Sequence, residues 1–146
     1  MANTKGIIVN IKGVDTKIEY SIDNFHILGL WDRPFKTIQD GSKQIEVRTN
    51  TQQIPFDFNL VTEGDQIKFI NEMTGEELIT KVVEINKYES ARLFLEEVGL
   101  EHSSSKPKNI DEGVKAIESH TGYQEGIKKH GLFAIKIEKI QTKKNG

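Results

Sequence analysis

The chain has 146 residues, of which 36% are hydrophobic and 29% charged, and its formal net charge at pH 7 is −2. This length predicts one domain that buries a core without metals or disulfides, and no apolar run reaches the roughly 20 residues that span a membrane. The near-neutral charge argues against a protein that binds long duplexes, whereas a pocket that reads one nucleotide needs few phosphate contacts.

The sequence contains no cysteine. This excludes a thiol nucleophile, a zinc ribbon and an iron–sulfur cluster, because each of them requires thiolate groups. The first six residues lack the apolar segment and the small-residue cleavage site of a secretory signal. We therefore expect a cytoplasmic protein that carries no cofactor.

Alternating apolar residues predict a β-hairpin at the N-terminus. They are Ile7, Val9 and Ile11 in the first strand and Ile18, Tyr20 and Ile22 in the second. The apolar run from Phe25 to Trp31 suits a buried strand. Pro34 can open a helix that runs to Asp40, and Gly41 tolerates the positive φ of a helix C-cap.

The next segment, residues 44–48, predicts a strand with two charged residues on one face. Its alternation places Ile45 and Val47 on one side and Gln44, Glu46 and Arg48 on the other. Residues 49–60 predict a loop that folds back onto the domain, with Phe56 and Phe58 as its anchors.

Three strands and two helices complete the prediction. The strands are Gln66–Ile70, Leu78–Ile85 and Leu132–Ile140, and the helices run from Glu89 to the stop at Gly99 and from Ile110 to Ile117. Residues 141–146 form a polar tail. Because strands outnumber helices and many are joined by short turns, the pattern favours a single α+β domain over residues 1–146, with a mainly antiparallel curled sheet.

One segment carries a family resemblance. Residues His26 to Arg48, HILGLWDRPFKTIQDGSKQIEVR, resemble the start of ASCH domains, whose hallmark after a short helix is G-x-K-x-x-E-x-R. The hallmark residues are Gly41, Lys43, Glu46 and Arg48. Two further blocks resemble the family in the same order, GDQIKFINEMTGEELITKVVEINKYES and TGYQEGIKKHGLFAIKIEKI. The resemblance covers about residues 25–140 and leaves the hairpin of residues 1–24 as an addition.

The resemblance implies a PUA-like fold, a small mixed β-barrel with flanking helices and a cleft lined by the hallmark residues. Domains of this family are generally thought to bind RNA or modified nucleosides. Some short bacterial members are amidohydrolases that deacetylate N4-acetylcytidine with a lysine, a threonine and a glutamate. Their lysine matches Lys43, but their threonine position holds Glu46, and their glutamate falls among Glu96, Glu97 and Glu101.

Each candidate site residue has a structural and a functional interpretation. Lys43 and Glu46 act together in the functional one, the ammonium lowering the pKa of the carboxylate or the carboxylate orienting the ammonium; otherwise they are a solvated strand end. Arg48 either positions Glu46 or contacts a ligand. Trp31 either stacks on a base or belongs to the core, and Tyr123 either offers its hydroxyl to a ligand or packs.

These residues support a leading hypothesis and an alternative. In the first, the protein is a binding module for RNA or a modified nucleoside: Lys43 and Arg48 donate, Glu46 accepts from a base or ribose, and Trp31 or Tyr123 forms an aromatic wall. In the second, it is a hydrolase of acylated nucleosides or of RNA, in which Lys43 and Glu46 activate water.

A third hypothesis is a protein-interaction groove bordered by Phe56 and Phe58. The four histidines, His26, His102, His120 and His130, lack metal-binding spacing, so we expect no metal site. None of them is placed by a known motif next to a hydroxyl, which argues against a serine-type triad.

Overall fold

The computed structural model describes residues 4–21, 24–54, 56–102 and 106–140, so the predicted polar tail lies outside the described residues. Its elements, in chain order, are β1 (Thr4–Ile11), β2 (Val14–Ser21), β3 (Phe25–Leu30), α1 (Asp32–Gln39), β4 (Ile45–Arg48), the 3-10 helix η1 (Phe58–Leu60), β5 (Gln66–Asn71), β6 (Glu77–Tyr88), α2 (Ala91–Val98), α3 (Ile110–Glu118), α4 (Tyr123–His130) and β7 (Leu132–Lys139). No described helix is long and apolar enough to cross a membrane.

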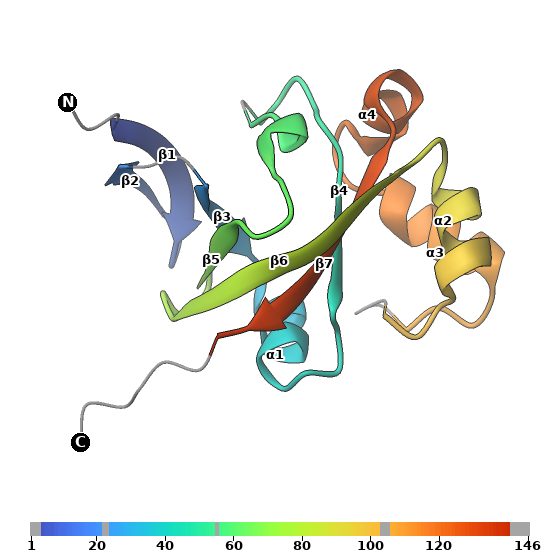
Figure 1. The fold of residues 1–146 in the computed structure, drawn as a ribbon, viewed down its shortest axis with the longest axis horizontal. Helices are drawn as coiled ribbons and strands as arrows, with labels where there is room; N and C mark the ends of the chain where they lie inside the picture. The colour runs from blue at the N-terminus through green and yellow to red at the C-terminus, as the bar shows by residue number, and fades with distance from the viewer. Residues whose placement is uncertain (1–3, 22–23, 55, 103–105, 141–146) are drawn as a thin grey trace.

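Five strands form one curled sheet in the order β3-β5-β6-β7-β4, and β1 pairs only with β2. The β3–β5 pair is parallel and the other three pairs are antiparallel. Figure 1 shows the long strand β6 crossing the molecule, with α2, α3 and α4 at one end and the β1–β2 hairpin at the other. The predicted α+β fold with a mixed, mainly antiparallel curled sheet is confirmed, and the five strands form a half-barrel.

Two hydrophobic cores lie on opposite faces of this sheet. The alternation of β7 sends Phe133, Ile135 and Ile137 into an inner core with β3, α1, β5 and β6. Leu132 and Ala134 point the other way, into an outer core under α2, α3 and α4. Both faces of β7 are therefore buried, which explains why its apolar residues are not restricted to one phase.

The N-terminal hairpin is confirmed, and it packs on the outside of the sheet. Val9 of β1 is buried against Ile27 of β3 and Ile70 of β5. At the hairpin turn, the backbone amide of Lys12 donates to the carbonyl oxygen of Glu72 over 2.7 Å. The hairpin thus covers a face of β3 and β5 rather than adding a strand to the sheet.

Two predicted boundaries need adjustment. Helix α1 begins at Asp32 rather than at Pro34, which fits within the first turn because the amide that proline lacks has no intrahelical acceptor there. Strand β6 runs to Tyr88 rather than to Ile85, since its end pairs with β7. The anchor role of the loop is confirmed, because Phe58 is buried in the inner core and contacts Phe56.

Candidate functional site

Three charged residues of the hallmark form one buried network. Nζ of Lys43 donates to Oε1 of Glu46 over 2.7 Å, and Nε of Arg48 donates to Oε2 of Glu46 over 2.8 Å. Their side chains are only 8%, 5% and 15% exposed for Lys43, Glu46 and Arg48, respectively. The structure therefore brings these three predicted site residues together and removes them from bulk water.

Local sequence explains this convergence. Gly41 has a φ of +87° and ends α1, as predicted, and the chain then turns so that the amide of Lys43 donates to the carbonyl oxygen of Thr37. In β4, Glu46 and Arg48 lie opposite Ile135 and Phe133 of β7, beside the inner core. Their neighbours in β4 pack into the outer core instead. Alternation thus places both charges on one side of the strand.

The electrostatics of the network favour the ionised forms. Burial by itself raises the pKa of Glu46, but the charges of Lys43 and Arg48 outweigh it and lower this pKa to about 2. Burial opposes the charge of Arg48 as well, yet Glu46 raises the pKa of the guanidinium. The carboxylate consequently stays ionised at neutral pH, with both oxygens already accepting hydrogen bonds.

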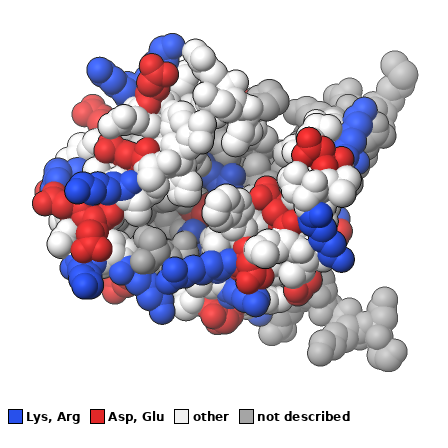
Figure 2. Space-filling model, turned by 180° about the vertical axis from the view of Figure 1, so that it is seen from behind, with Lys and Arg blue, Asp and Glu red and all other residues white. Residues whose placement is uncertain are grey.

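The network lies where the sheet leaves its two edges unpaired. Strands β3 and β4 are the two ends of the sheet order, and Nη2 of Arg48 reaches across to donate to the carbonyl oxygen of Gly29 over 3.0 Å. We call this line between β3 and β4 the seam, marked by Gly29, Glu46 and Arg48. No described residue hydrogen-bonds with Nη1 of Arg48. Seen from behind, the molecule is hollowed, with basic and acidic atoms recessed among uncharged side chains (Figure 2).

His120 and Tyr123 lie close enough to the network to feel its charges. Burial raises the pKa of the Tyr123 hydroxyl, Arg48 lowers it and Glu46 raises it. Burial lowers the pKa of His120, which Glu46 opposes and Arg48 reinforces. The centroids of the His120 and Tyr123 rings are 5.1 Å apart. The predicted Tyr123 therefore belongs to the surroundings of the network, and His120 is a neighbour that sequence reasoning missed.

Helix α4 carries Tyr123 and follows the turn that holds His120, and it packs closely on the chain after β4. A Cβ on Gly126 would lie 2.3 Å from the carbonyl oxygen of Asn50, so only glycine permits this approach. Thr49 completes the contact by donating from its hydroxyl to the carbonyl oxygen of Gly131. A glycine in the middle of a predicted helix is the sequence signal that marks such close packing.

Trp31 is not a core residue: it is 75% exposed at the start of α1. Its indole lies close enough to the carboxylate of Glu72 to lower the pKa of that group, which also feels the charge of Arg48. Glu72 is a second neighbour that the sequence analysis did not predict. The signal that marks it is Gly29, because a glycine inside a strand often marks a close approach by another group.

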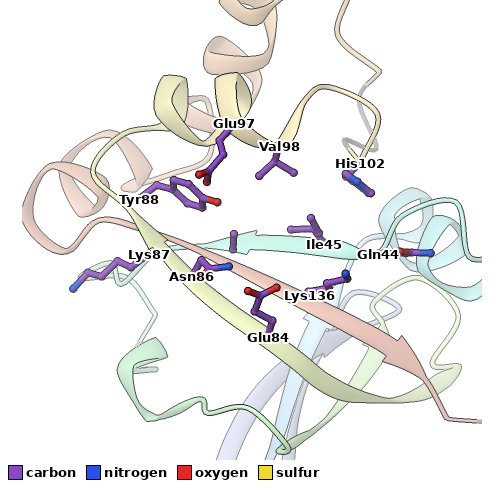
Figure 3. A pocket seen from close by; sticks show the side chains of 11 residues that line it. Gln44, Ile45, Glu84, Asn86, Lys87, Tyr88, Glu97, Val98, His102 and Lys136 are labelled. Atoms are coloured by element: carbon purple, nitrogen blue, oxygen red, sulfur yellow. The ribbon is translucent and has the colours of Figure 1, made fainter.

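A cavity of about 750 Å³ lies on the other side of β4, between the sheet and α2 (Figure 3). Its lining residues are Gln44, Ile45, Glu84, Asn86, Lys87, Tyr88, Glu97, Val98, His102, Ala134 and Lys136. There Glu97 accepts a hydrogen bond from Tyr88, whose pKa rises to about 12 mainly for that reason. Glu96 and Glu101 are exposed. Glu97, one of the three candidates for the amidohydrolase glutamate, therefore lies away from the seam.

Three hydroxyls close to the hallmark in sequence hydrogen-bond with the backbone rather than with a basic side chain. Thr37, Ser42 and Thr49 each donate to a backbone carbonyl oxygen. His26 instead pairs with Asp65, with 2.8 Å between Nε2 and Oδ2, in a buried structural contact. Among the described residues no group of three or more His, Cys, Asp or Glu side chains is arranged to hold a metal ion.

Comparison with known proteins identifies the family of this chain. The family model of the ASCH domain matches residues 28–141. The chain belongs to the ASCH domain family. This ASCH domain is similar to the crystal structure of hypothetical protein PH0355, with 33% identity and a TM-score of 0.66 over 80% of this chain and 99% of that one.

It is also similar to the solution NMR structure of protein PF0455 from Pyrococcus furiosus, with 30% identity and a TM-score of 0.62 over 81% of this chain and 99% of the other. A search of curated proteins found no match. The family match begins within β3, so the β1–β2 hairpin lies outside the matched part of this ASCH domain.

Proposed function

We propose that this ASCH domain binds RNA or a modified nucleoside at the seam. The observation that carries the proposal is the buried Lys43–Glu46–Arg48 network beside two unpaired strand edges. Burying three charged groups costs free energy of desolvation, so buried charges are kept where they are fully paired or serve a function. Here the two cations keep donors that Glu46 does not use. Because the family is associated with RNA, a nucleotide is the ligand that we expect these donors to bind.

The geometry gives the acidic and the basic residues of the network different roles. Glu46 accepts from both cations and so positions them, rather than reading a base itself. Lys43 has two further ammonium hydrogens, and Arg48 has the two of Nη1. These donors suit carbonyl or phosphate oxygens of a nucleotide. Trp31 offers an exposed ring, and Tyr123 lies close enough to the network to feel its charges, so these two aromatic residues are the candidates for stacking on a base.

Hydrolysis of an acylated nucleoside is supported less well. A carboxylate with a pKa of about 2, whose two oxygens both accept hydrogen bonds, is a weak general base near neutral pH. The hydroxyls of Thr37, Ser42 and Thr49 donate to backbone carbonyl oxygens, and no described basic side chain hydrogen-bonds with them. The seam is therefore better suited to hold a ligand than to activate water.

Binding is tested by NMR titration of the ¹⁵N-labelled protein with nucleosides, including N4-acetylcytidine, and with short single-stranded RNA. We expect shifts of the backbone amides near Lys43, Arg48 and Tyr123. Lys43→Ala should weaken binding about tenfold, as loss of a charge-assisted hydrogen bond predicts. Lys115→Ala, which removes an exposed lysine of α3, is the matched control and should bind like the wild type.

The spectra also report whether each variant is folded, which matters because Lys43→Ala leaves Glu46 with one partner. If no ligand shifts these amides, the binding proposal is abandoned. Chromatography of the N4-acetylcytidine sample tests the alternative: release of acetate that disappears in Lys43→Ala would identify an enzyme instead.

A further inference from the structure

A second carboxylate, that of Glu72, lies against the seam. Its backbone amide donates to the carbonyl oxygen of Leu30 over 2.8 Å, which fixes the residue beside the end of β3. A Cβ on Gly29 would lie 2.4 Å from Oε1 of Glu72. The carboxylate therefore rests directly over the Gly29 backbone, in space that any other residue at position 29 would fill.

Gly29 is also the residue whose carbonyl oxygen accepts from Nη2 of Arg48. One backbone position is thus flanked by a donor, the guanidinium of Arg48, and an acceptor, the carboxylate of Glu72. Among the described residues no ion pair within 4.0 Å joins the two. Burial raises the pKa of Glu72, and Arg48 lowers it only in part. Both groups thus keep capacity to bind a ligand.

Trp31 supplies a flat surface beside this pair. Its side chain is 75% exposed, and the indole lies close enough to the carboxylate of Glu72 to lower the pKa of that group. Indole nitrogen is only a donor, so it favours the ionised carboxylate. An exposed ring beside such polar groups can stack on a base while these groups reach its edge.

We propose, resting on the proposed nucleotide binding, that the seam prefers guanine. The Watson–Crick edge of guanine presents one carbonyl oxygen beside two adjacent donors, the ring N–H and the exocyclic amino group. Nη1 of Arg48 donates to the carbonyl oxygen, the two oxygens of Glu72 accept from the two donors, and Trp31 stacks on the ring. Cytosine, adenine and uracil each offer a carboxylate only one donor group on this edge.

The test is a titration with GMP, IMP, CMP, AMP and UMP. Trp31 is the only tryptophan, so intrinsic fluorescence reports on its surroundings directly, and NMR shifts provide a second readout. We expect GMP to bind about tenfold more tightly than CMP, AMP or UMP. IMP lacks the exocyclic amino group and should be weaker than GMP.

Two variants test the assignment of Glu72. Glu72→Gln should lower GMP affinity about tenfold and so reduce the preference for GMP over CMP and AMP, because one acceptor oxygen becomes a donor. Gly29→Ala should act in the same direction by displacing the Glu72 carboxylate. Glu76→Gln, which changes an exposed carboxylate in the same β5–β6 turn, is the matched control and should keep the preference for GMP.

The outcomes separate this inference from the proposed function. Equal affinity for all the nucleotides, or an unchanged preference in Glu72→Gln, overturns the assignment of guanine while nucleotide binding at the seam stands. Absence of any binding, by fluorescence and by NMR, overturns both.

Discussion

Nη2 of Arg48 donates to the backbone carbonyl oxygen of Gly29 over 3.0 Å, and this contact joins the two edge strands of the five-stranded sheet. Its Nε meanwhile donates to Glu46. A side chain, rather than a ladder of backbone hydrogen bonds, therefore bridges the open side of the half-barrel. Edge strands need such protection against pairing with other chains, and here the protecting group also carries a charge into the candidate site.

Replacing Arg48 by lysine should loosen the seam. A lysine keeps the charge, but its single nitrogen cannot reproduce the fork that contacts Glu46 and Gly29 together. We expect the free energy of unfolding, measured with urea, to fall by about 1–2 kcal/mol. Arg33→Lys, at an exposed arginine of α1, should be neutral. Equal stability of the two variants would show that the bridge contributes nothing to the fold.

Replacing Glu46 by glutamine should destabilise the protein more strongly. The change leaves the buried ammonium of Lys43 and the guanidinium of Arg48 without their counter-charge. Breaking a buried ion pair typically lowers the free energy of unfolding by about 3 kcal/mol or more. Thermal or urea unfolding at pH 7 measures the loss, with Glu84→Gln, an exposed carboxylate of β6, as the control. A loss as small as that of the control would contradict the paired geometry.

The same carboxylate makes stability depend on pH in the acid range. The pKa of Glu46 is about 2 in the folded protein, compared with an ordinary value of 4.5. Its contribution is fully present above pH 4.5 and is lost as the pH falls towards 2, because only the unfolded state binds the proton in that window. We expect urea unfolding to show falling stability over this range and Glu46→Gln to have a shallower slope.

Some acid sensitivity should persist in Glu46→Gln. The pKa of Asp65 is also lowered, because the hydrogen bonds from His26 and Thr62 outweigh the effect of burial. Combining Glu46→Gln with Asp65→Asn should flatten the profile further. A slope that is identical in the wild type and in Glu46→Gln would refute the low pKa of Glu46.

The N-terminal hairpin should contribute to stability although it lies outside the family match. Val9 is buried against Ile27 and Ile70, whereas Ile8 of the same strand is 62% exposed. Val9→Ala should therefore lower the free energy of unfolding by about 2 kcal/mol, from lost burial and the resulting cavity. Ile8→Ala should change it by less than about 0.5 kcal/mol. Similar effects of the two changes in urea unfolding would mean that the hairpin does not dock as described.

Much of the fold follows from local patterns. The alternation in β4 predicted that Glu46 and Arg48 share a face, and Gly41 was expected to end α1 with a positive φ, as it does. In each case the pattern and the structure agree because backbone geometry alone fixes which neighbouring side chains lie on one side. Strand limits were less accurate: β6 extends three residues further than predicted because β7 pairs with it.

The surroundings of the network could not be predicted in the same way. Tryptophan is a residue type that is often buried, yet Trp31 is exposed at the start of α1. His120 and Glu72 lie outside the hallmark. His120 comes near the network because α4, which follows it, packs on the chain after β4. Glu72 comes near Gly29 because β5, which precedes it, lies parallel to β3. Such contacts depend on burial summed over the whole chain, which no local window contains.

The family and the hallmark residues can be recognised in the sequence. The side of β4 on which Glu46 and Arg48 lie also follows from it, because a strand alternates its side chains with a period of two. The contact of Arg48 with Gly29 and the position of Glu72 over the same residue depend instead on the tertiary structure. These contacts join β4, β3 and the turn after β5, and their geometry is set by the pairing order and curl of the sheet, which arise from long-range packing rather than from local preference.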